Sequence, residues 1–348
     1  MLPQVLPALL PGSDPWPLWP SLVALLLSAG VIVYTGTKIT GVVDEIADRT
    51  GLGEAIAGAI FLGATTSLPG LVTLATGALA GDAQFALANP VGGILIQTVW
   101  LSVADIFYRR VNLEHAAASS ENLMQSLILV GLLAVPLFGY AVPNLSLFAV
   151  HPASLAIPVL YVAGLVLVRQ QRNEPMWEPV ETPDTVHDEP EEPSERSAGR
   201  LAVLFLSLAV SMAVAGYTVG RAGLGVVEAT GLSGGLVGST LTTGVSSMPE
   251  LVTLIAAVRM RALALGVGDI IGGNVFDALQ IALADVFYRQ GVVYADAGPT
   301  GLLLLAAALL MSALLAAGLL LRGRRGIGFE GFAIPTIWVA AIVGVAFL

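Results

Sequence analysis

The sequence contains a repeated segment, and this repeat restricts the possible folds more than any other feature. When the chain is shifted by 180 residues, Ser67-Leu-Pro-Gly-Leu-Val-Thr-Leu74 aligns with Ser247-Met-Pro-Glu-Leu-Val-Thr-Leu254. The alignment needs no gap, and 17 of the 60 positions from 50 to 109 are identical to their counterparts from 230 to 289. Repeated apolar segments that carry glycine, proline and carboxylates are typical of membrane transporters built from two structural repeats.

The composition is that of a membrane protein. Hydrophobic residues make up 56% of the chain and charged residues 11%, and the mean hydropathy is +0.84. A soluble globular protein carries about 25% charged residues. Many apolar runs are about 20 residues long, enough to cross roughly 30 Å of hydrocarbon. We therefore predict an all-α, multi-pass integral protein of the cell membrane that contacts the lipid bilayer and binds no nucleic acid.

Cysteine and histidine usage excludes some metal sites. The chain has no cysteine and three histidines, and the histidines do not cluster. A disulfide framework and a thiolate metal site are therefore excluded, and a histidine zinc site is not expected. Sequence alone leaves the oligomeric state open.

We predict ten transmembrane helices as two repeats of five, with broken helices at the membrane midplane. The first repeat covers residues 1–168, a linker covers 169–199 and the second repeat covers 200–348. The linker is acidic and Pro-rich, with nine acidic residues and five prolines between 174 and 195. It is too polar to pack, which favours a flexible tether over a cation-sensing regulatory loop. The predicted spans are 18–37, 52–80, 83–104, 123–142, 145–168, 200–220, 234–258, 263–286, 300–321 and 329–347.

Lysine and arginine residues orient these spans. If the linker is cytoplasmic, 13 of the 15 basic residues lie on the cytoplasmic side, as the positive-inside rule requires. Because each repeat has an odd number of spans, the second repeat must enter the membrane from the opposite side. The two repeats are therefore predicted to be inverted relative to each other.

Two spans carry a proline inside an apolar stretch, at Pro69 and Pro249. Proline removes a backbone donor and is expected to kink or break the helix. Hydroxyl groups precede each proline, at Thr66 and Ser67 in the first copy and at Ser246 and Ser247 in the second. Hydroxyls and freed carbonyls suit Na⁺ or Ca²⁺, although they could instead satisfy the kinked backbone.

Glu250 is the strongest candidate ligand, because a carboxylate in mid-span costs several kcal/mol without a functional partner. Glycine-rich segments in the next span of each copy supply Asn89, Asp269 and Asn274 as further oxygen ligands. Gln97 and Asp277 occupy equivalent positions two turns further on, and are either ligands or structural hydrogen-bonding groups. Pro90 predicts a second helix break.

Two further carboxylates close the repeated segments. In the motif Ala-Asp-x-Phe-Tyr-Arg, Asp105 and Asp285 lie near the ends of spans. They are expected to act as interfacial anchors that pair with Arg109 and Arg289 four residues later.

The paired segments resemble the α-repeats of the cation/calcium antiporter superfamily, of the sodium/calcium exchanger type. The second copy matches this pattern well in Ser246-Ser-Met-Pro-Glu250 and Gly268-Asp-Ile-Ile-Gly-Gly-Asn-Val-Phe-Asp277. The first copy departs from it, with Gly70 where the family has glutamate and Ile94 where it has asparagine. The resemblance implies a site for Ca²⁺ or several Na⁺ between two membrane glutamates, with helices that slide to alternate access.

The resemblance implies a secondary active cation antiporter that needs no cofactor and is not an enzyme. The absence of a carboxylate at Gly70 is expected to weaken the binding of Ca²⁺ more than the binding of Na⁺ or H⁺. At an effective dielectric near 20, one charge pair at about 4 Å is worth roughly 4 kcal/mol, and a divalent ion loses twice that. Exchange of Ca²⁺ for Na⁺, or of a cation for H⁺, therefore remains open.

Two other functions remain possible from the sequence. The first is a degenerate exchanger that senses a cation or scaffolds a partner without transporting. The second, an intramembrane hydrolase, would need a placed Ser–His or Asp–Asp pair.

Overall fold

The described part of the molecule consists of helices. The structure is a computed structural model, and it describes residues 15–50, 63–107, 119–173, 196–260, 263–321 and 328–348. Within these ranges no β-strand forms, apart from an isolated bridge between Leu147 and Val150. The helices are α1 (Leu18–Thr50), α3 (Gly63–Thr66), α4 (Leu68–Ala80), α5 (Ala83–Phe107), α7 (Ser120–Ala141), α8 (Pro152–Asn173), α9 (Ala198–Thr230), α10 (Gly234–Val237), the π-helical turn η4 (Gly238–Thr242), α11 (Thr243–Ser246), α12 (Met248–Met260), α13 (Leu263–Phe287), α14 (Val293–Asp296), α15 (Gly298–Leu320) and α16 (Glu330–Ala346).

Seven of the described helices are long and apolar enough to cross a membrane. A further pair of helical segments, Gly234–Ser246 and Met248–Arg259, meets at an angle of 49° and forms an eighth candidate span if counted as one. Two shorter apolar helices are α4 and α16. This confirms the all-α, multi-pass character of the chain, while the count of ten spans stays a prediction.

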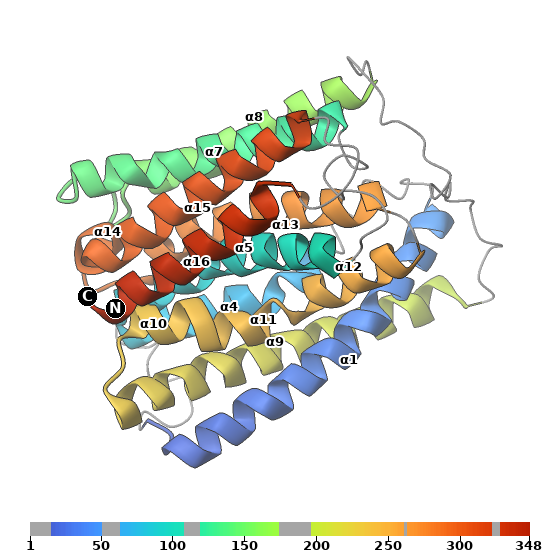
Figure 1. Cartoon of the computed structure of the whole chain (residues 1–348). Helices are drawn as coiled ribbons and strands as arrows, with labels where there is room; N and C mark the ends of the chain where they lie inside the picture. The colour runs from blue at the N-terminus through green and yellow to red at the C-terminus, as the bar shows by residue number, and fades with distance from the viewer. Residues whose placement is uncertain (1–14, 51–62, 108–118, 174–195, 261–262, 322–327) are drawn as a thin grey trace.

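The helices form three groups (Figure 1). α7 and α8 lie along one edge, α1 and α9 pack along each other at the opposite edge, and α4, α5, α12 and α13 lie between them. Burial follows this order: 83% of the apolar stretch of α5 is buried, against 22% for that of α8 and of α9. α5 and α13 are therefore central, and the outer helices present their leucine and valine side chains outward, as a bilayer requires.

The central helices of the two halves match in position. α3 ends at Thr66 and α4 begins at Leu68, and α11 ends and α12 begins 180 residues later, at Ser246 and Met248. The two copies therefore break at equivalent positions. α4 and α5 meet in a tight turn at Gly81, whose φ of 88° lies in the left-handed region that glycine adopts without strain.

Several outer helices differ from the predicted spans. α1 and α9 each contain 33 residues, or about 50 Å of helix, which is longer than the hydrocarbon core. The prediction placed the helix ends where the apolar runs end, but charged residues such as Glu45 do not stop a helix. α8 begins at Pro152 instead of residue 145, because proline is favoured in the first turn.

Two predictions from proline and from charge pairs need correction. Pro90 lies inside the continuous helix α5 and does not break it. Asp285 is fully buried and accepts hydrogen bonds from the backbone N–H groups of His151 (2.7 Å) and Val293 (3.3 Å). It also accepts one from Ser154 Oγ (2.7 Å), while Arg289 is exposed. Asp285 thus joins α13 to α8 and α14. Arg109 and the Asp105 side chain lie outside the described residues.

Candidate cation site

The two spans that carry Pro69 and Pro249 each break two residues before the proline. α3 ends at Thr66 and α4 begins at Leu68, so the first break falls at Ser67. The second break falls at Ser247, between α11 and α12. Pro69 stands in the first turn of α4, where its missing N–H removes no helical hydrogen bond. The prolines therefore begin new helical segments, and the serines are the points of change in direction.

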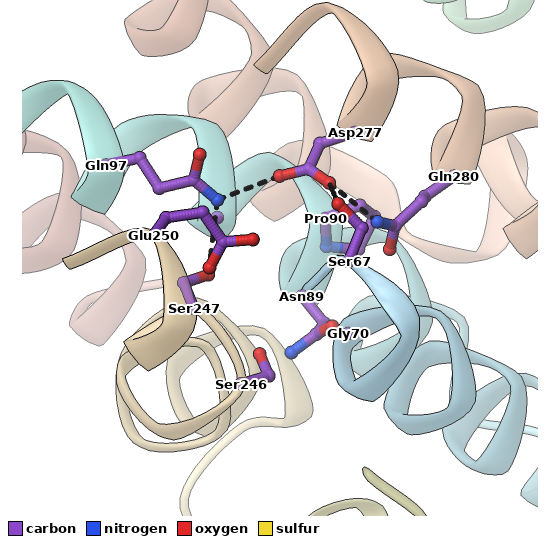
Figure 2. A pocket seen from close by; sticks show the side chains of 11 residues that line it. Ser67, Gly70, Asn89, Pro90, Gln97, Ser246, Ser247, Glu250, Asp277 and Gln280 are labelled. Atoms are coloured by element: carbon purple, nitrogen blue, oxygen red, sulfur yellow. Dashed lines mark hydrogen bonds between the residues drawn. The ribbon is translucent and has the colours of Figure 1, made fainter. Parts of the chain in front are cut away.

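A small cavity lies between the two breaks (Figure 2). It offers about 10 Å³ to the centre of a water-sized sphere, which is room for one water molecule or one dehydrated ion. Its walls come from α4, α5, α11, α12, α13 and the two break residues. The lining residues are Ser67, Gly70, Asn89, Pro90, Gly93, Gln97, Ser246, Ser247, Glu250, Asp277 and Gln280.

Asp277 is the most heavily hydrogen-bonded carboxylate of the cavity. Its Oδ1 accepts from Ser67 Oγ (2.9 Å) and from Gln280 Nε2 (2.7 Å). Its Oδ2 accepts from Gln97 Nε2 (2.9 Å), and the same Gln97 nitrogen lies 3.4 Å from Ser247 Oγ. Three donors stabilise a buried carboxylate and fix its orientation. Asp277 therefore joins both breaks and both central helices through its side chain.

Glu250 presents a free oxygen to the same space. The residue is 5% exposed, and its Oε2 has no hydrogen-bond partner in the described part of the chain. Thr66 is hydrogen-bonded to its carboxyl group, and Asp277 and, more weakly, Asp269 interact with it electrostatically. Figure 2 shows the carboxyl group pointing toward the space bounded by Asp277 and Asn89. An unpartnered buried carboxylate oxygen is costly, which makes it a strong candidate for a cation ligand.

Asn89 is held by the π-helical turn and the start of α11. Its Nδ2 donates to Thr242 Oγ1 (3.1 Å) and lies 3.4 Å from Thr243 Oγ1. Thr243 Oγ1 in turn donates to the Asn89 backbone oxygen (2.9 Å). These contacts fix the orientation of the amide and leave Oδ1 on the side of Gly70. The close approach needs Gly92, where a Cβ would lie 2.7 Å from the Cα of Ser239.

The cavity gathers most of the predicted ligands but not all of them. Five of the eight line it: Glu250, Asn89, Ser67, Ser246 and Ser247. Thr66 lies behind them, at the Glu250 carboxyl group. Asp269 lies outside the lining and accepts a hydrogen bond from Thr253 Oγ1 (2.7 Å). Asn274 also lies outside it, and its Nδ2 donates to Thr98 Oγ1 (3.1 Å).

Helix geometry explains this separation. Asp269 and Asp277 are eight residues apart on α13, so they lie about 12 Å from each other along the helix axis. Asp277, near the middle of α13, is the one that reaches the break at Ser67.

Three polar residues of the lining were not among the eight predicted ligands: Asp277 and Gln97, for which the sequence left a ligand role and a structural role open, and Gln280. The sequence did carry a signal for the first two, because both are polar residues at equivalent repeat positions within apolar helices. Gln280 has the apolar Trp100 as its counterpart, and nothing in the sequence marks it.

The lining is a mixed set of oxygens. Among the described residues, no three His, Cys, Asp or Glu side chains gather into a metal cluster. Two carboxylates, amide oxygens and serine hydroxyls would therefore have to share a cation, a donor set suited to hard cations such as Na⁺.

The helices and this buried polar cavity define a multi-pass integral membrane protein. The chain belongs to the sodium/calcium exchanger family, because the family model described as sodium/calcium exchanger protein matches residues 20–169 and 200–347. The match covers both halves of the chain and leaves out the linker. This family consists of membrane cation exchangers that work without a cofactor, so the chain is a transporter and not an enzyme. The predicted family, the absence of a cofactor and the assignment as a transporter are thereby confirmed.

Solved structures support the same fold. The sodium-calcium exchanger NCX_Mj soaked with Na⁺ and Sr²⁺ is 18% identical, with a TM-score of 0.55 over 93% of this chain and 98% of that chain. The same exchanger soaked with Na⁺ and no Ca²⁺ is 17% identical, with a TM-score of 0.56 over 94% and 99%. Native YfkE is 15% identical, with a TM-score of 0.59 over 95% and 94%. No curated protein matched the sequence.

Proposed function

We propose that the chain is a secondary active antiporter that binds its cations in the cavity around Glu250, with a selectivity shifted from Ca²⁺ toward Na⁺ or H⁺. The observation that carries this proposal is the buried, unpartnered Oε2 of Glu250 at a cavity with room for one ion. The family of the chain supports cation antiport in general. Its coupling would come from an ion gradient.

The distribution of charge supports the shift in selectivity. Both carboxylates of the lining, Glu250 and Asp277, belong to the second half of the chain, and α4 offers only Gly70. Asp277 is engaged by three protein donors, so Glu250 Oε2 is the carboxylate oxygen most available to an ion. One charge pair at about 4 Å is worth roughly 4 kcal/mol at an effective dielectric near 20, and twice that for a divalent ion. A site short of negative charge therefore penalises Ca²⁺ more than Na⁺.

The proposed ligands fall into two groups. Glu250, Asn89, Ser67, Ser246 and Ser247 would contact the ion, together with Asp277. Thr66, Asp269 and Asn274 stay predictions as ligands, and their positions favour a role beside the cavity. Rearrangement of α12 or α13 during transport would be needed to bring Asp269 to an ion.

We further propose ten spans in two inverted repeats, with the domain limits 1–168, 169–199 and 200–348 and a cytoplasmic linker. The seven long helices, the bent pair, α4 and α16 together provide enough apolar segments for this plan. The equivalent breaks between α3 and α4 and between α11 and α12 support the repeat, and the distribution of basic residues supports the inversion.

Ion flux in proteoliposomes tests the proposal. The purified full-length protein is reconstituted with an imposed Na⁺ or pH gradient, and Na⁺, H⁺ and Ca²⁺ movements are followed. We expect gradient-driven exchange of Na⁺ or H⁺ that exceeds Ca²⁺ transport and is lost in Glu250→Gln. Exposed Glu228 near the end of α9 supplies a matched control, since Glu228→Gln removes a charge that is not part of the cavity lining.

The outcomes separate the competing functions. Na⁺-driven Ca²⁺ uptake as the dominant activity would contradict the shift in selectivity but not the antiport. Absence of any Glu250-dependent flux would contradict antiport and favour the sensor or scaffold.

A further inference from the structure

The first turn of α4 contributes no side chain to the cavity, and another helix fills the space. A Cβ atom on Gly70 would lie 3.4 Å from Gln280 Oε1 and 3.8 Å from Asn89 Oδ1. Two amide oxygens from α13 and α5 thus converge on the face of Gly70. The corner of the cavity opposite Glu250 is therefore lined by neutral oxygens.

Gln280 is placed like a ligand. It is 3% exposed and stands one turn beyond Asp277 on α13. Its Nε2 donates to Asp277 Oδ1 at 2.7 Å, which fixes the amide plane. Its Oε1 is buried and has no hydrogen-bond partner in the described part of the chain. A buried amide oxygen without a partner is unfavourable unless a water or a cation completes it.

We propose that Gln280 is a cation ligand and a selectivity-determining residue of this exchanger. Its amide oxygen occupies the corner that Gly70 leaves open, and it offers a partial negative charge where a carboxylate from α4 would offer a full one. The ligand class that fits is a dehydrated monovalent cation such as Na⁺ bound by neutral oxygens and one free carboxylate oxygen. This inference rests on the proposed function, because it assigns a further residue to the same site.

The space around Gly70 explains why the two positions depend on each other. A larger residue at 70 would extend its side chain into the space that Gln280 Oε1 occupies. A carboxylate introduced at either position would therefore lie in the same corner. The effects of Gly70→Glu and Gln280→Glu should consequently be non-additive, as for any pair of residues in contact.

The test measures cation binding and flux in the same full-length variants. Na⁺ and Ca²⁺ are titrated calorimetrically into the purified protein in detergent, and the fluxes are measured in proteoliposomes. In Gln280→Glu we expect the ratio of Ca²⁺ to Na⁺ affinity to rise at least about tenfold, since a full charge replaces a dipole at ion-contact distance. In Gln280→Leu we expect Na⁺ binding to weaken about tenfold, within the range seen when groups that support a metal are removed.

Gln125 provides matched controls. It lies on α7, its Oε1 is also buried without a partner in the described part of the chain, and it does not line the cavity. Gln125→Glu and Gln125→Leu should leave the affinity ratio unchanged.

Each result bears on the inference. An unchanged Ca²⁺ to Na⁺ ratio in Gln280→Glu, with Glu250→Gln still inactive, would overturn the role of Gln280 and leave the proposed function intact. If Gln280→Glu fails to fold, unchanged Na⁺ affinity in Gln280→Leu overturns it equally. If the unmodified protein shows no flux but the Ca²⁺ to Na⁺ affinity ratio shifts in Gln280→Glu, the result would support Gln280 as a ligand and refute antiport.

Discussion

Gln97 Nε2 donates a 2.9 Å hydrogen bond to Asp277 Oδ2, and these two residues are one repeat length, 180 positions, apart in the chain. The two copies of the repeated segment thus contact each other through equivalent residues at the cavity. One copy supplies the amide donor and the other the carboxylate acceptor. The repeat has therefore diverged into two chemically complementary halves at this point.

This bond predicts the result of exchanging its partners. Asp277→Asn should weaken cation binding at least about tenfold, because the amide keeps one acceptor oxygen but loses the charge that three donors face. Combining Gln97→Asp with Asp277→Gln moves the carboxylate to α5 and permits the reversed bond. We expect this double variant to recover part of the binding. Calorimetric titration with Na⁺ measures both, and no recovery would show that the direction of the pair matters.

Asp269 and Asp277 should differ in importance for transport. Asp277 lines the cavity, whereas Asp269 lies outside its lining and is bonded to Thr253. We expect Asp277→Asn to reduce Na⁺ or H⁺ flux at least about tenfold, as for groups that support a metal, and Asp269→Asn to reduce it less, because its side chain lies outside the lining. Flux assays in parallel decide this. Equal losses would support Asp269 as a ligand that reaches the ion in another conformation.

Glycine at position 92 should be needed for the approach of α5 to the π-helical turn. A Cβ there would lie 2.7 Å from Ser239 Cα, so Gly92→Ala must push backbones apart. Overpacking of this kind costs about 1–3 kcal/mol of stability. Gly244→Ala is the control, because a Cβ at Gly244 meets nothing within 4 Å. Thermal unfolding in detergent should show a lower Tm for Gly92→Ala alone. Equal Tm values for the two variants would mean that the backbone of η4 can shift without loss of stability.

Asp285 should contribute to stability and not to transport. It is fully buried and accepts bonds from the His151 and Val293 backbones and from Ser154. Asp285→Ala leaves these donors unsatisfied, each at a cost of about 1–3 kcal/mol, whereas Asp285→Asn keeps one acceptor. We expect Asp285→Asn to lower the Tm and Asp285→Ala to lower it further, with the flux per folded protein unchanged in both. A selective loss of flux at normal Tm would contradict this.

Hydropathy and the repeat were sufficient to predict the class of protein. A chain in a bilayer must satisfy its backbone within helices or a closed barrel, and apolar runs of about 20 residues select helices, so the all-α membrane fold followed from composition and run length. Pro69 and Pro249 marked both helix breaks to within two residues, and Glu250 was identified because a mid-span carboxylate is costly. These signals are local, and they are readable without knowing which helices touch.

Only the tertiary structure decided which polar groups share the cavity. Ser67 and Asp277 are 210 residues apart, and Gln97 and Ser247 are 150 apart, so their contacts depend on how the helices rotate and cross. Asp269 and Asn274 were both predicted as ligands, yet the packing of α13 turns Asp277 and Gln280 toward the cavity. Sequence determined that this chain spans a membrane as a repeat with a buried acidic site. Helix packing decided the members of that site, because the face that a helix presents is set by its neighbours as well as by its own residues.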